Sequence, residues 1–472
     1  MQMFLEGRWT SGSKSQAVVN PYNGQAFEEV PIAGAAEIDR ALTTLAKGAA
    51  AMRALSGWER SQILDRAAKL LAEQLEDFAR TITLEEGKPI RESRLEAKRA
   101  GDVLTVSAEE ARRLCGEMIP LDGADSGKGK IGFTLRVPCG IVAAITPFNF
   151  PLNLTAHKVG PAIAGGNAVL IKPAGNTPLS ALKLTRILLD AGLPPEAIAC
   201  ITGPGGELGK AICEDSRIRK ISFTGSYEVG ETICRAAGVK KVTMELGGNA
   251  PVVIMDDANL DKAATAIASA GYANAGQVCI SAQRIVTDKR IQGHFVDALA
   301  AKVKGLKGGD PLHDDTMISP LVRQRDAERV ASWIDEAAGQ GAQLVTGGKR
   351  SGAFVEPAIL NNVTMDMKVG REELFGPAVA VMPFTSLDDA IRVANDTRYG
   401  LSAGIFTQDI DRAMRFAKDV DSGCLHINWS SQWRADLMPY GGLKDSGFGK
   451  EGPAYAIREM TEEKAVVLHL TQ

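Results

Sequence analysis

The sequence predicts an α/β fold with more than one domain, on three observations. The chain has 472 residues, more than the roughly 250 to 300 that one hydrophobic core usually supports. Between residues 140 and 247, strand-like apolar segments alternate with helix-like segments, which is typical of βαβ units around a parallel sheet. A second α/β series begins with PVVIM at 251–255 and runs to about Pro439.

The part of the chain before residue 140 predicts short strands and then a helical layer. Residues 1–30 predict two short strands around the turn-forming stretches GRWTSG and NPYNGQ, an edge β-meander. Charges at helical spacing predict long amphipathic helices over 37–55, 60–87 and 90–114. IGFTLRVP at 131–138 then predicts a strand that leaves the domain as a hairpin arm, and its exposed edge invites pairing with another chain.

The alternating series has a definite order of expected elements. Strands are expected over 140–146, 167–173, 197–203, 220–225 and 240–247. Helices are expected over 157–166, 178–192, 207–215 and 227–238. After PVVIM, a helix over 259–275 and a strand over 284–288 follow, and KAVVLHL at 464–470 predicts a final strand with an exposed edge.

Composition excludes several classes of protein. A formal net charge of −3 without basic clusters argues against a nucleic-acid partner. Seven cysteines without a CxxC pair argue against a disulfide framework, and five scattered histidines argue against a metal site. The first residues lack a signal peptide and the apolar runs are short, so no membrane span is expected. We therefore expect a cytoplasmic protein.

Cys279, in the stretch GYANAGQVCIS at 271–281, is the candidate nucleophile. Free cysteine behaves mostly as a small buried hydrophobe, and the six other cysteines have the same prior. The nucleophile interpretation therefore requires an oxyanion donor, a base and a cofactor site that converge on this thiol.

Glycine-rich turns between strands and helices suggest a phosphate site. ITGPGGELG contains Gly203, Gly205 and Gly209, and FTGS at 223–226 repeats the same geometry with Ser226 at a helix N-terminus. Such turns let a backbone approach a phosphate, although each one alone equally fits a plain tight turn. Two in succession favour a dinucleotide.

Lys172 lies at the end of an expected strand, on the edge where α/β folds place ligands. A solvated lysine is the alternative interpretation. Three positions later stands Gly175, where an acid would favour NAD over NADP by binding the ribose 2′-hydroxyl. Its absence leaves the choice between the two cofactors open.

Two further residues suit acyl chemistry. Asn149 in PFNFP has a side-chain amide that can donate to an oxyanion, although asparagine beside proline also fits a turn. Glu245 in MELGG ends an expected strand and can serve as a general base, although a lone glutamate is usually solvated.

The order of these motifs along the chain resembles the aldehyde dehydrogenase superfamily. PFNFP, IKPAGNTP, FTGS, MELGG and GQVCIS are followed by EELFGP at 372–377 and MPYGGLKDSGFG at 438–449, so the resemblance covers nearly the full length. It implies an NAD(P)-binding domain of variant Rossmann fold over 1–118 and 139–247 and a catalytic domain over 248–445. It also implies a β-strand oligomerisation arm over 119–138 and 458–472, which would build a homodimer or homotetramer.

The resemblance also implies roles for single residues. Cys279 is the implied nucleophile, Asn149 with the Cys279 backbone amide the oxyanion hole, and Glu245 the base, with Lys158 and Glu451 nearby. Lys172 would bind the adenosine ribose, Ser226 the pyrophosphate, and Glu373 with Phe375 the nicotinamide ribose and ring. The other cofactor contacts are expected from Thr146, Pro147, Phe148, Gly175, Gly205, Gly209, Phe223, Thr224, Gly225 and Leu246.

The implied chemistry accounts for these residue types. A thiolate attacks the aldehyde carbon, amide donors stabilise the oxyanion, a hydride passes to the nicotinamide, and Glu245 activates water to hydrolyse the thioester. Family members that pass the acyl group to coenzyme A generally lack a glutamate at this position. A coenzyme A-acylating semialdehyde dehydrogenase is therefore the alternative enzyme. A non-catalytic protein that keeps the fold is the other alternative, but it would require loss of catalytic residues, and all of them are present in this sequence.

Within the superfamily, the chain resembles the lactaldehyde, succinate-semialdehyde and phosphonoacetaldehyde dehydrogenases. The shared stretches are HKVGPAIAGGNAVLIKPAGNTP and INWSSQWRADLMPYGG. Arg434 and Arg99 are candidate clamps for an anionic substrate tail, because guanidinium pairs bidentately with carboxylate or phosphonate; surface arginines are the alternative. Phe150, Ile280 and Ser281 are expected to line the substrate pocket.

Overall fold

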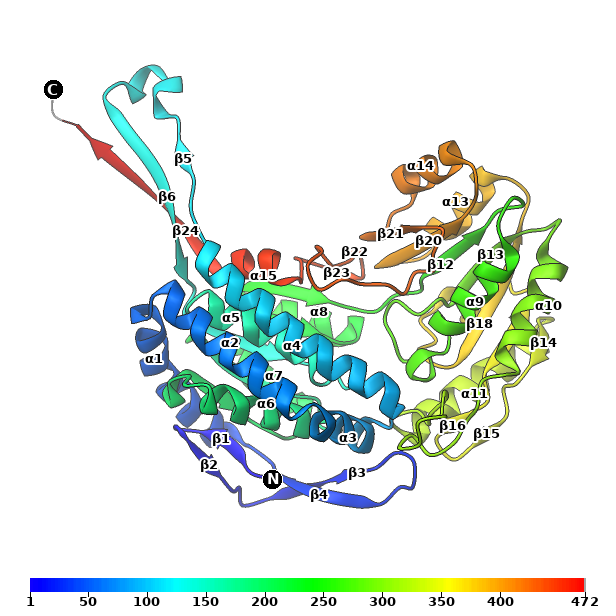
Figure 1. Ribbon diagram of the computed structural model, residues 1–472, viewed down its shortest axis with the longest axis horizontal. Coiled ribbons are helices and arrows are strands. Elements are labelled where there is room, and N and C mark those ends of the chain that lie inside the picture. Colours follow the sequence, from blue (N-terminus) through cyan, green and yellow to red (C-terminus); the bar gives the residue numbers. More distant parts are fainter. Residues whose placement is uncertain (471–472) are drawn as a thin grey trace.

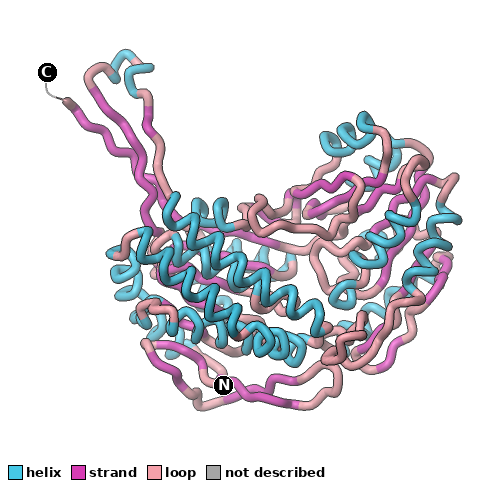
Figure 2. Tube along the Cα trace, viewed as in Figure 1, coloured by secondary structure: helices cyan, strands magenta, loops and turns pink. Residues whose placement is uncertain are grey.

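Two large sheets and a projecting arm make up the protein in the computed structural model, which describes residues 1–470 (Figure 1). Figure 2 shows the helices packed around the first sheet and the strands of the arm extending away from it. No helix within the described residues is both long and apolar enough to cross a membrane.

The first sheet has the strand order β2-β1-β9-β8-β7-β10-β11-β23. Its parallel strands are β7 (Ile141–Ile145), β8 (Ala168–Lys172), β9 (Ile198–Cys200), β10 (Ile218–Thr224) and β11 (Lys241–Glu245). They alternate with the helices α5 (Asn153–Ala164), α6 (Leu179–Asp190), α7 (Gly205–Glu214) and α8 (Tyr227–Ala237). The predicted βαβ series is therefore confirmed.

The N-terminal strands differ from the predicted meander. Four strands form in place of two, β1 (Met3–Leu5), β2 (Arg8–Thr10), β3 (Ser15–Val19) and β4 (Ala26–Pro31). β1 adds antiparallel to β9 in the first sheet, whereas β3 and β4 form a separate hairpin. The prediction was wrong because β1 and β2 are only three residues each, too short for a periodic pattern.

The helical layer consists of α1 (Ala35–Ala54), α2 (Gly57–Glu73), α3 (Leu75–Glu86) and α4 (Ile90–Arg113). The predicted helix over 60–87 is wrong as a single element, because the backbone leaves helical geometry at Gln74 (φ −107°, ψ 19°). The short helix α15 (Pro453–Glu459) packs against this layer and α5.

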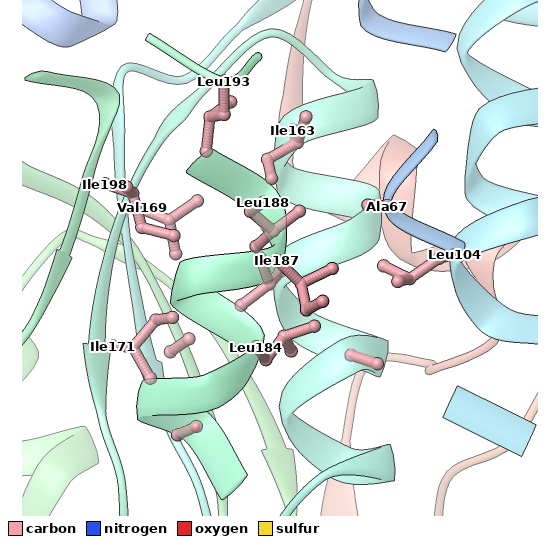
Figure 3. Packing of buried hydrophobic residues seen from close by; sticks show 14 of the residues in the cluster. Ala67, Leu104, Ile163, Val169, Ile171, Leu184, Ile187, Leu188, Leu193 and Ile198 are labelled. Carbon is pink, nitrogen blue, oxygen red and sulfur yellow. The ribbon is translucent and has the colours of Figure 1, made fainter. Parts of the chain in front are cut away.

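The first sheet is buried on both faces. Val169 and Ile171 of β8 pack with Leu184, Ile187 and Leu188 of α6 (Figure 3). Ala168 and Leu170, the alternate residues of the same strand, belong to the core on the opposite face. Because side chains alternate along a strand, this double burial requires the near-continuous apolar run that the sequence has here.

The second sheet has the order β14-β17-β18-β13-β12-β20-β21. Its strands are β12 (Pro251–Ile254), β13 (Arg284–Asp288), β14 (Gln343–Thr346), β17 (Ala358–Asn361), β18 (Ala378–Phe384), β20 (Ser402–Phe406) and β21 (Cys424–Ile427). Its helices are α9 (Leu260–Ala270), α10 (Gln292–Val303), α11 (Gln324–Gly339), α12 (Lys368–Arg371), α13 (Leu387–Asn395) and α14 (Ile410–Asp419). Two small pairs join β15 (Arg350–Ser351) to β16 (Phe354–Val355) and β19 (Tyr399–Gly400) to β22 (Leu443–Lys444).

The chain returns from the second sheet to the first near its C-terminus. β23 (Gly447–Phe448) pairs antiparallel with the end of β11, where Glu245 faces Gly447. A segment more than 200 residues later in the chain therefore fixes the strand that carries Glu245.

The projecting arm is a three-stranded sheet in the order β24-β6-β5. Its strands are β5 (Met118–Ile119), β6 (Lys130–Pro138) and β24 (Thr461–His469), with two short 3-10 helices at Leu121–Gly123 and Asp125–Gly127. Ile131, Leu135, Val467 and Leu468 remain 41 to 45% exposed, so apolar side chains face outwards on this projecting sheet. Residues 471 and 472 of the expected arm lie outside the described residues.

Two glycines inside helices test the packing of the helical layer. An alanine at Gly101 in α4 would make only ordinary contacts, its Cβ 3.8 Å from Leu71, whereas at Gly48 in α1 it would lie 2.1 Å from the Glu196 carbonyl oxygen. Gly101→Ala is expected to stabilise the protein by about 0.5–1 kcal/mol through helix propensity, and Gly48→Ala to destabilise it by about 1–3 kcal/mol through overpacking. Denaturation midpoints measure both, and a stabilised Gly48→Ala variant would contradict the described contact of α1 with 195–197.

Candidate active site

Cys279 lies in the loop between α9 and β13. The predicted helix over 259–275 is wrong beyond Ala270, because Asn274, Ala275 and Gly276 take positive φ angles of 49°, 53° and 72°. The helix ends at Ala270, and the turn that follows presents the half-buried thiol to a cavity of about 930 Å³. A Cβ on Gly248 would lie 2.4 Å from the Cys279 carbonyl oxygen, so the chain leaving β11 packs directly against the cysteine.

Asn149 is held at both ends next to this loop. Its side-chain Nδ2 donates a hydrogen bond to the Gln277 carbonyl at 2.8 Å. Its own carbonyl accepts from Lys88 Nζ at 2.5 Å and from Asn274 Nδ2 at 3.3 Å. The amide expected to stabilise an oxyanion is therefore fixed beside the cysteine loop.

The Lys88–Glu96 ion pair holds the backbone of Asn149 in place. The sequence did not predict this pair. Both side chains are fully buried, with Lys88 Nζ 2.5 Å from Glu96 Oε2. Glu96 Oε1 accepts from the backbone N–H groups of Leu152 and Asn153 at the start of α5, where a carboxylate favours the helix dipole. The available signal was a lysine in the loop between two expected helices, which also fits a solvated residue.

Glu245 ends β11 as a buried carboxyl group. Neither of its oxygens has a hydrogen-bond partner within residues 1–470. Burial and the neighbouring Glu451 raise the pKa of Glu245 well above its usual value, while Arg434 and Lys158 oppose the rise. A carboxyl group with a raised pKa and free lone pairs has the properties of a general base.

Lys158, Glu451 and Arg434 form a buried ion network behind Glu245. Glu451 Oε1 lies 2.8 Å from Lys158 Nζ, and its Oε2 lies 3.0 Å from Arg434 NH1. Burial alone would raise the pKa of Glu451, but Lys158 and Arg434 hold it down at about 2. Glu451 therefore remains ionised, whereas the pKa of the neighbouring Glu245 is raised.

The network continues towards the surface through His157, Asp436 and Arg99. Arg434 NH2 lies 3.1 Å from His157 Nδ1, and His157 Nε2 lies 2.8 Å from Asp436 Oδ1. Burial and Arg434 lower the pKa of His157 to about 4, so the ring is neutral, accepting from Arg434 and donating to Asp436. Arg99 binds Asp436 bidentately at 2.7 and 3.2 Å; His157 and Asp436 were not predicted.

The large cavity lies at the carboxyl ends of β7, β8, β10 and β11 and is closed by the second sheet's loops. Its volume is within the range of small-molecule and cofactor sites. Every residue expected to contact a cofactor lines it: Thr146, Pro147, Phe148, Lys172, Gly175, Gly205, Gly209, Phe223, Thr224, Gly225, Ser226, Leu246, Glu373 and Phe375. Their contacts with a nucleotide stay a prediction.

The chemistry of the lining fits a dinucleotide. Nothing lies within 4 Å of a Cβ built on Gly205 or Gly209, so the start of α7 is open to a close ligand. The buried hydroxyls of Thr146 and Thr224 find no partner among the described residues. Ser226 caps α8 by accepting from the Val229 N–H at 3.5 Å. The accessible starts of helices α7 and α8, with hydroxyl groups nearby, suit a pyrophosphate.

Lys172 and Glu373 face the same cavity as buried ionisable groups. Lys172 Nζ donates to the Pro173 carbonyl at 2.7 Å and retains further N–H donors for a ribose. Burial lowers its pKa to about 8. Glu373 Oε1 accepts from the Gly248 N–H at 2.8 Å, and burial raises the pKa of Glu373 to about 7.

The residues expected to line the substrate pocket are not among those that line this cavity. Ile280 belongs to a small apolar cluster with Tyr440 and Leu401, and Phe150 packs against that cluster. The Ser281 hydroxyl instead donates to the Ala270 and Gly271 carbonyls at the end of α9. Ser281 thus stabilises the loop, and its place in the substrate pocket stays a prediction.

Comparison with known proteins agrees with this geometry. The sequence profile of the aldehyde dehydrogenase family matches residues 9–466. The 3-sulfolactaldehyde dehydrogenase of Priestia megaterium is 46% identical over 468 residues, covering 99% of this chain and 98% of that protein. Aldehyde dehydrogenase 21 from Physcomitrella patens, solved with the reaction product succinate, is 38% identical with a TM-score of 0.96 over 99% of this chain and 98% of its own.

A second solved structure is that of glyceraldehyde-3-phosphate dehydrogenase from Methanocaldococcus jannaschii, complexed with NADP. It is 37% identical with a TM-score of 0.94, covering 97% of this chain and 100% of its own.

The protein has two α/β sheets and a cavity of about 930 Å³ that Cys279 lines, and its solved relatives include NAD- and NADP-dependent enzymes. These features define an NAD(P)-dependent dehydrogenase. The chain belongs to the aldehyde dehydrogenase family. Its activity is accordingly the oxidation of aldehydes with NAD or NADP.

The Lys88–Glu96 pair predicts a stability effect that a second substitution reverses. Lys88→Met leaves the Glu96 carboxylate buried without its cation and is expected to cost about 3–5 kcal/mol of unfolding free energy. Adding Glu96→Gln removes that charge while an amide oxygen still accepts from Leu152 and Asn153. The double variant is therefore expected to recover most of the loss in a denaturation midpoint; equal instability of single and double variants would contradict the ion-pair account.

Proposed function

We propose that this enzyme oxidises a short aldehyde with an anionic or strongly polar tail to the carboxylic acid, through a thiohemiacetal and a thioester on Cys279. Asn149 Nδ2 and the Cys279 backbone amide stabilise the oxyanion, and Glu245 activates the hydrolytic water. NAD or NADP, held by the lining of the cavity, supplies the hydride acceptor. Residues 1–118 and 139–247 form the cofactor domain, and 248–445 the catalytic domain.

One observation carries this proposal: the buried Glu245 carboxyl group, without a partner within residues 1–470, on the strand whose continuation packs against Cys279. A buried carboxyl group without hydrogen bonds is costly and is retained where a ligand or water uses it. The same group supports hydrolysis of the thioester over transfer of its acyl group to coenzyme A.

Arg434 supports an anionic tail better than Arg99 does. Both ends of the Arg99 fork already engage Asp436. Arg434 is buried, and its Nε has no partner in the described part of the chain. Its guanidinium also stacks on the Tyr440 ring at 4.0 Å, and the Tyr440 hydroxyl lies 3.3 Å from Cys279 Sγ. A buried guanidinium donor without a partner, next to the tyrosine that contacts the thiol, suits a carboxylate or sulfonate on a short aldehyde.

The arm supports a homodimer or homotetramer. Strand β24 has β6 on one side and no neighbour on the other within residues 1–470. An unpaired edge with exposed apolar side chains is a template for a second chain, so residues 119–138 and 458–472 form the oligomerisation arm of the proposal.

Cys279→Ser tests the nucleophile. Serine lacks an accessible anion at neutral pH, so dehydrogenase turnover is expected to fall by about three orders of magnitude or more. Binding of NAD and NADP, followed by fluorescence titration, is expected to stay within about twofold because the Cys279 side chain is one of many groups lining the cavity. Full turnover in Cys279→Ser would end the proposed mechanism.

A panel of aldehydes tests the substrate class. Initial rates are measured for lactaldehyde, 3-sulfolactaldehyde, succinate semialdehyde, phosphonoacetaldehyde and glyceraldehyde 3-phosphate, with each cofactor, and the acid product is identified without and with coenzyme A. Arg434→Lys, which keeps the charge but loses the fork, is expected to raise KM for the preferred anionic aldehyde about tenfold or more. The rise for uncharged lactaldehyde is expected to be smaller.

Arg91→Lys, at an exposed position on α4, is the matched control for that panel. Unchanged KM values for every anionic aldehyde in both Arg434→Lys and Arg99→Lys would reject the anionic clamp. An acyl-coenzyme A product would reject hydrolysis.

A further inference from the structure

Tyr440 contacts the reacting sulfur of the proposed mechanism. Its hydroxyl oxygen lies 3.3 Å from Cys279 Sγ. Tyr440 is 4% exposed and packs in the apolar cluster beside Cys279. The expected nucleophile, oxyanion donor and base do not include this residue, and the sequence motif MPYGG gave it no role.

We propose that Tyr440 is a catalytic residue that donates a hydrogen bond to the Cys279 thiolate and thereby sets the fraction of reactive anion. This inference rests on the proposed role of Cys279 as nucleophile. While the thiol keeps its proton, either atom can be the donor. A thiolate has no proton to give, so after ionisation the phenol alone donates, and the bond becomes a charge-assisted one of greater strength.

The surroundings of Cys279 make such a donor necessary. The pKa of the Cys279 thiol is raised to about 12, chiefly by burial; the hydrogen bond from Tyr440 and the charge of Arg434 act to lower it, and Glu373 and Glu245 act to raise it. A hydrogen bond to the charged form favours that form. Of the two groups that favour the thiolate, Tyr440 is the one in hydrogen-bond contact with the sulfur.

Tyr440 is held in place for this role from both sides. The Arg434 guanidinium lies over its ring at 4.0 Å, a cation–π contact that fixes the ring and draws electron density away from the hydroxyl. Its backbone exchanges two hydrogen bonds with Glu451, at 2.7 and 3.2 Å. Glu451 therefore fixes the backbone of Tyr440 directly and its ring through Arg434.

Tyr440 acts as a donor and keeps its own proton. Burial raises its pKa well above the usual value, so the phenol stays protonated at neutral pH. The proton that leaves Cys279 passes to solvent water, and no bond of Tyr440 is broken. When the sulfur attacks the aldehyde carbon, the negative charge moves to the substrate oxygen, and the hydrogen bond from Tyr440 weakens.

Alkylation of Cys279 by iodoacetamide in Tyr440→Phe tests this assignment without an aldehyde. Reaction at each cysteine is followed by peptide mass spectrometry. Loss of one hydrogen bond to a charged group is expected to slow alkylation of Cys279 about tenfold or more at neutral pH. The exposed Cys115 in the same sample serves as an internal control with an unchanged rate, and Tyr22→Phe, at an exposed tyrosine, as a control variant.

The direction of the change separates the donor role from a packing role. Phenylalanine lacks the hydroxyl oxygen and leaves the sulfur more accessible, so loss of packing alone predicts equal or faster alkylation. An equal or faster rate at Cys279 would therefore overturn the proposal. A parallel fall in kcat/KM for the preferred aldehyde, with the Kd of NAD or NADP unchanged, is expected together with the slower alkylation.

Arg434→Lys gives an independent test should Tyr440→Phe not fold. It keeps the hydroxyl but removes the planar cation from the ring, and slower alkylation of Cys279 is expected; an unchanged or faster rate would overturn the proposal. Because the assay contains no aldehyde, full turnover of Cys279→Ser would reject the proposed function and leave the contact between Tyr440 and the thiolate to be judged by alkylation alone.

Discussion

The buried carboxylate of Glu451 is the interaction on which the geometry around Cys279 depends. It pairs with Lys158 from α5 on one oxygen and with Arg434 from the loop after β21 on the other, and its backbone bridges Tyr440. Buried ion pairs contribute little net stability, because desolvation offsets their attraction, but they fix geometry and are costly to break. Helix α5 and the segment 434–451, which are distant in the chain, are thus held in one arrangement.

A second buried pair does the same for another loop next to Cys279. Lys88 and Glu96 fix the loop of Asn149, as Glu451 fixes the loop of Tyr440. The cysteine lies between two polar frameworks whose members are almost all satisfied, whereas Glu245 is left without partners within residues 1–470. The contrast agrees with a rigid site in which one carboxyl group is free to exchange a proton.

The sequence predicted the alternating series, both α/β units and the order of the motifs, because hydrophobic periodicity and glycine turns are local signals. It did not predict Lys88, His157, Asp436 or Tyr440, because their partners are distant in the chain: 61 residues separate Lys88 from Asn149, and 279 separate His157 from Asp436. From the sequence alone, charged residues on a helix are expected to face solvent, because the element that packs against them is not known. The break at Gln74 was missed because both halves share one helical period.

The pairing of β23 with the end of β11 has a consequence for synthesis of the chain. Glu245 faces Gly447, and Arg434, Tyr440 and Glu451 all follow β21. A ribosome releases the N-terminal residues first, and domains fold as they emerge. The parallel strands of the first sheet and the loop of Cys279 can therefore form before the segment after β21 is available to bring the phenol, the guanidinium and the buried carboxylate to the thiol. Until then the thiol lacks the hydrogen-bond donor that the proposal assigns to Tyr440, so a less reactive cysteine is expected in the nascent chain.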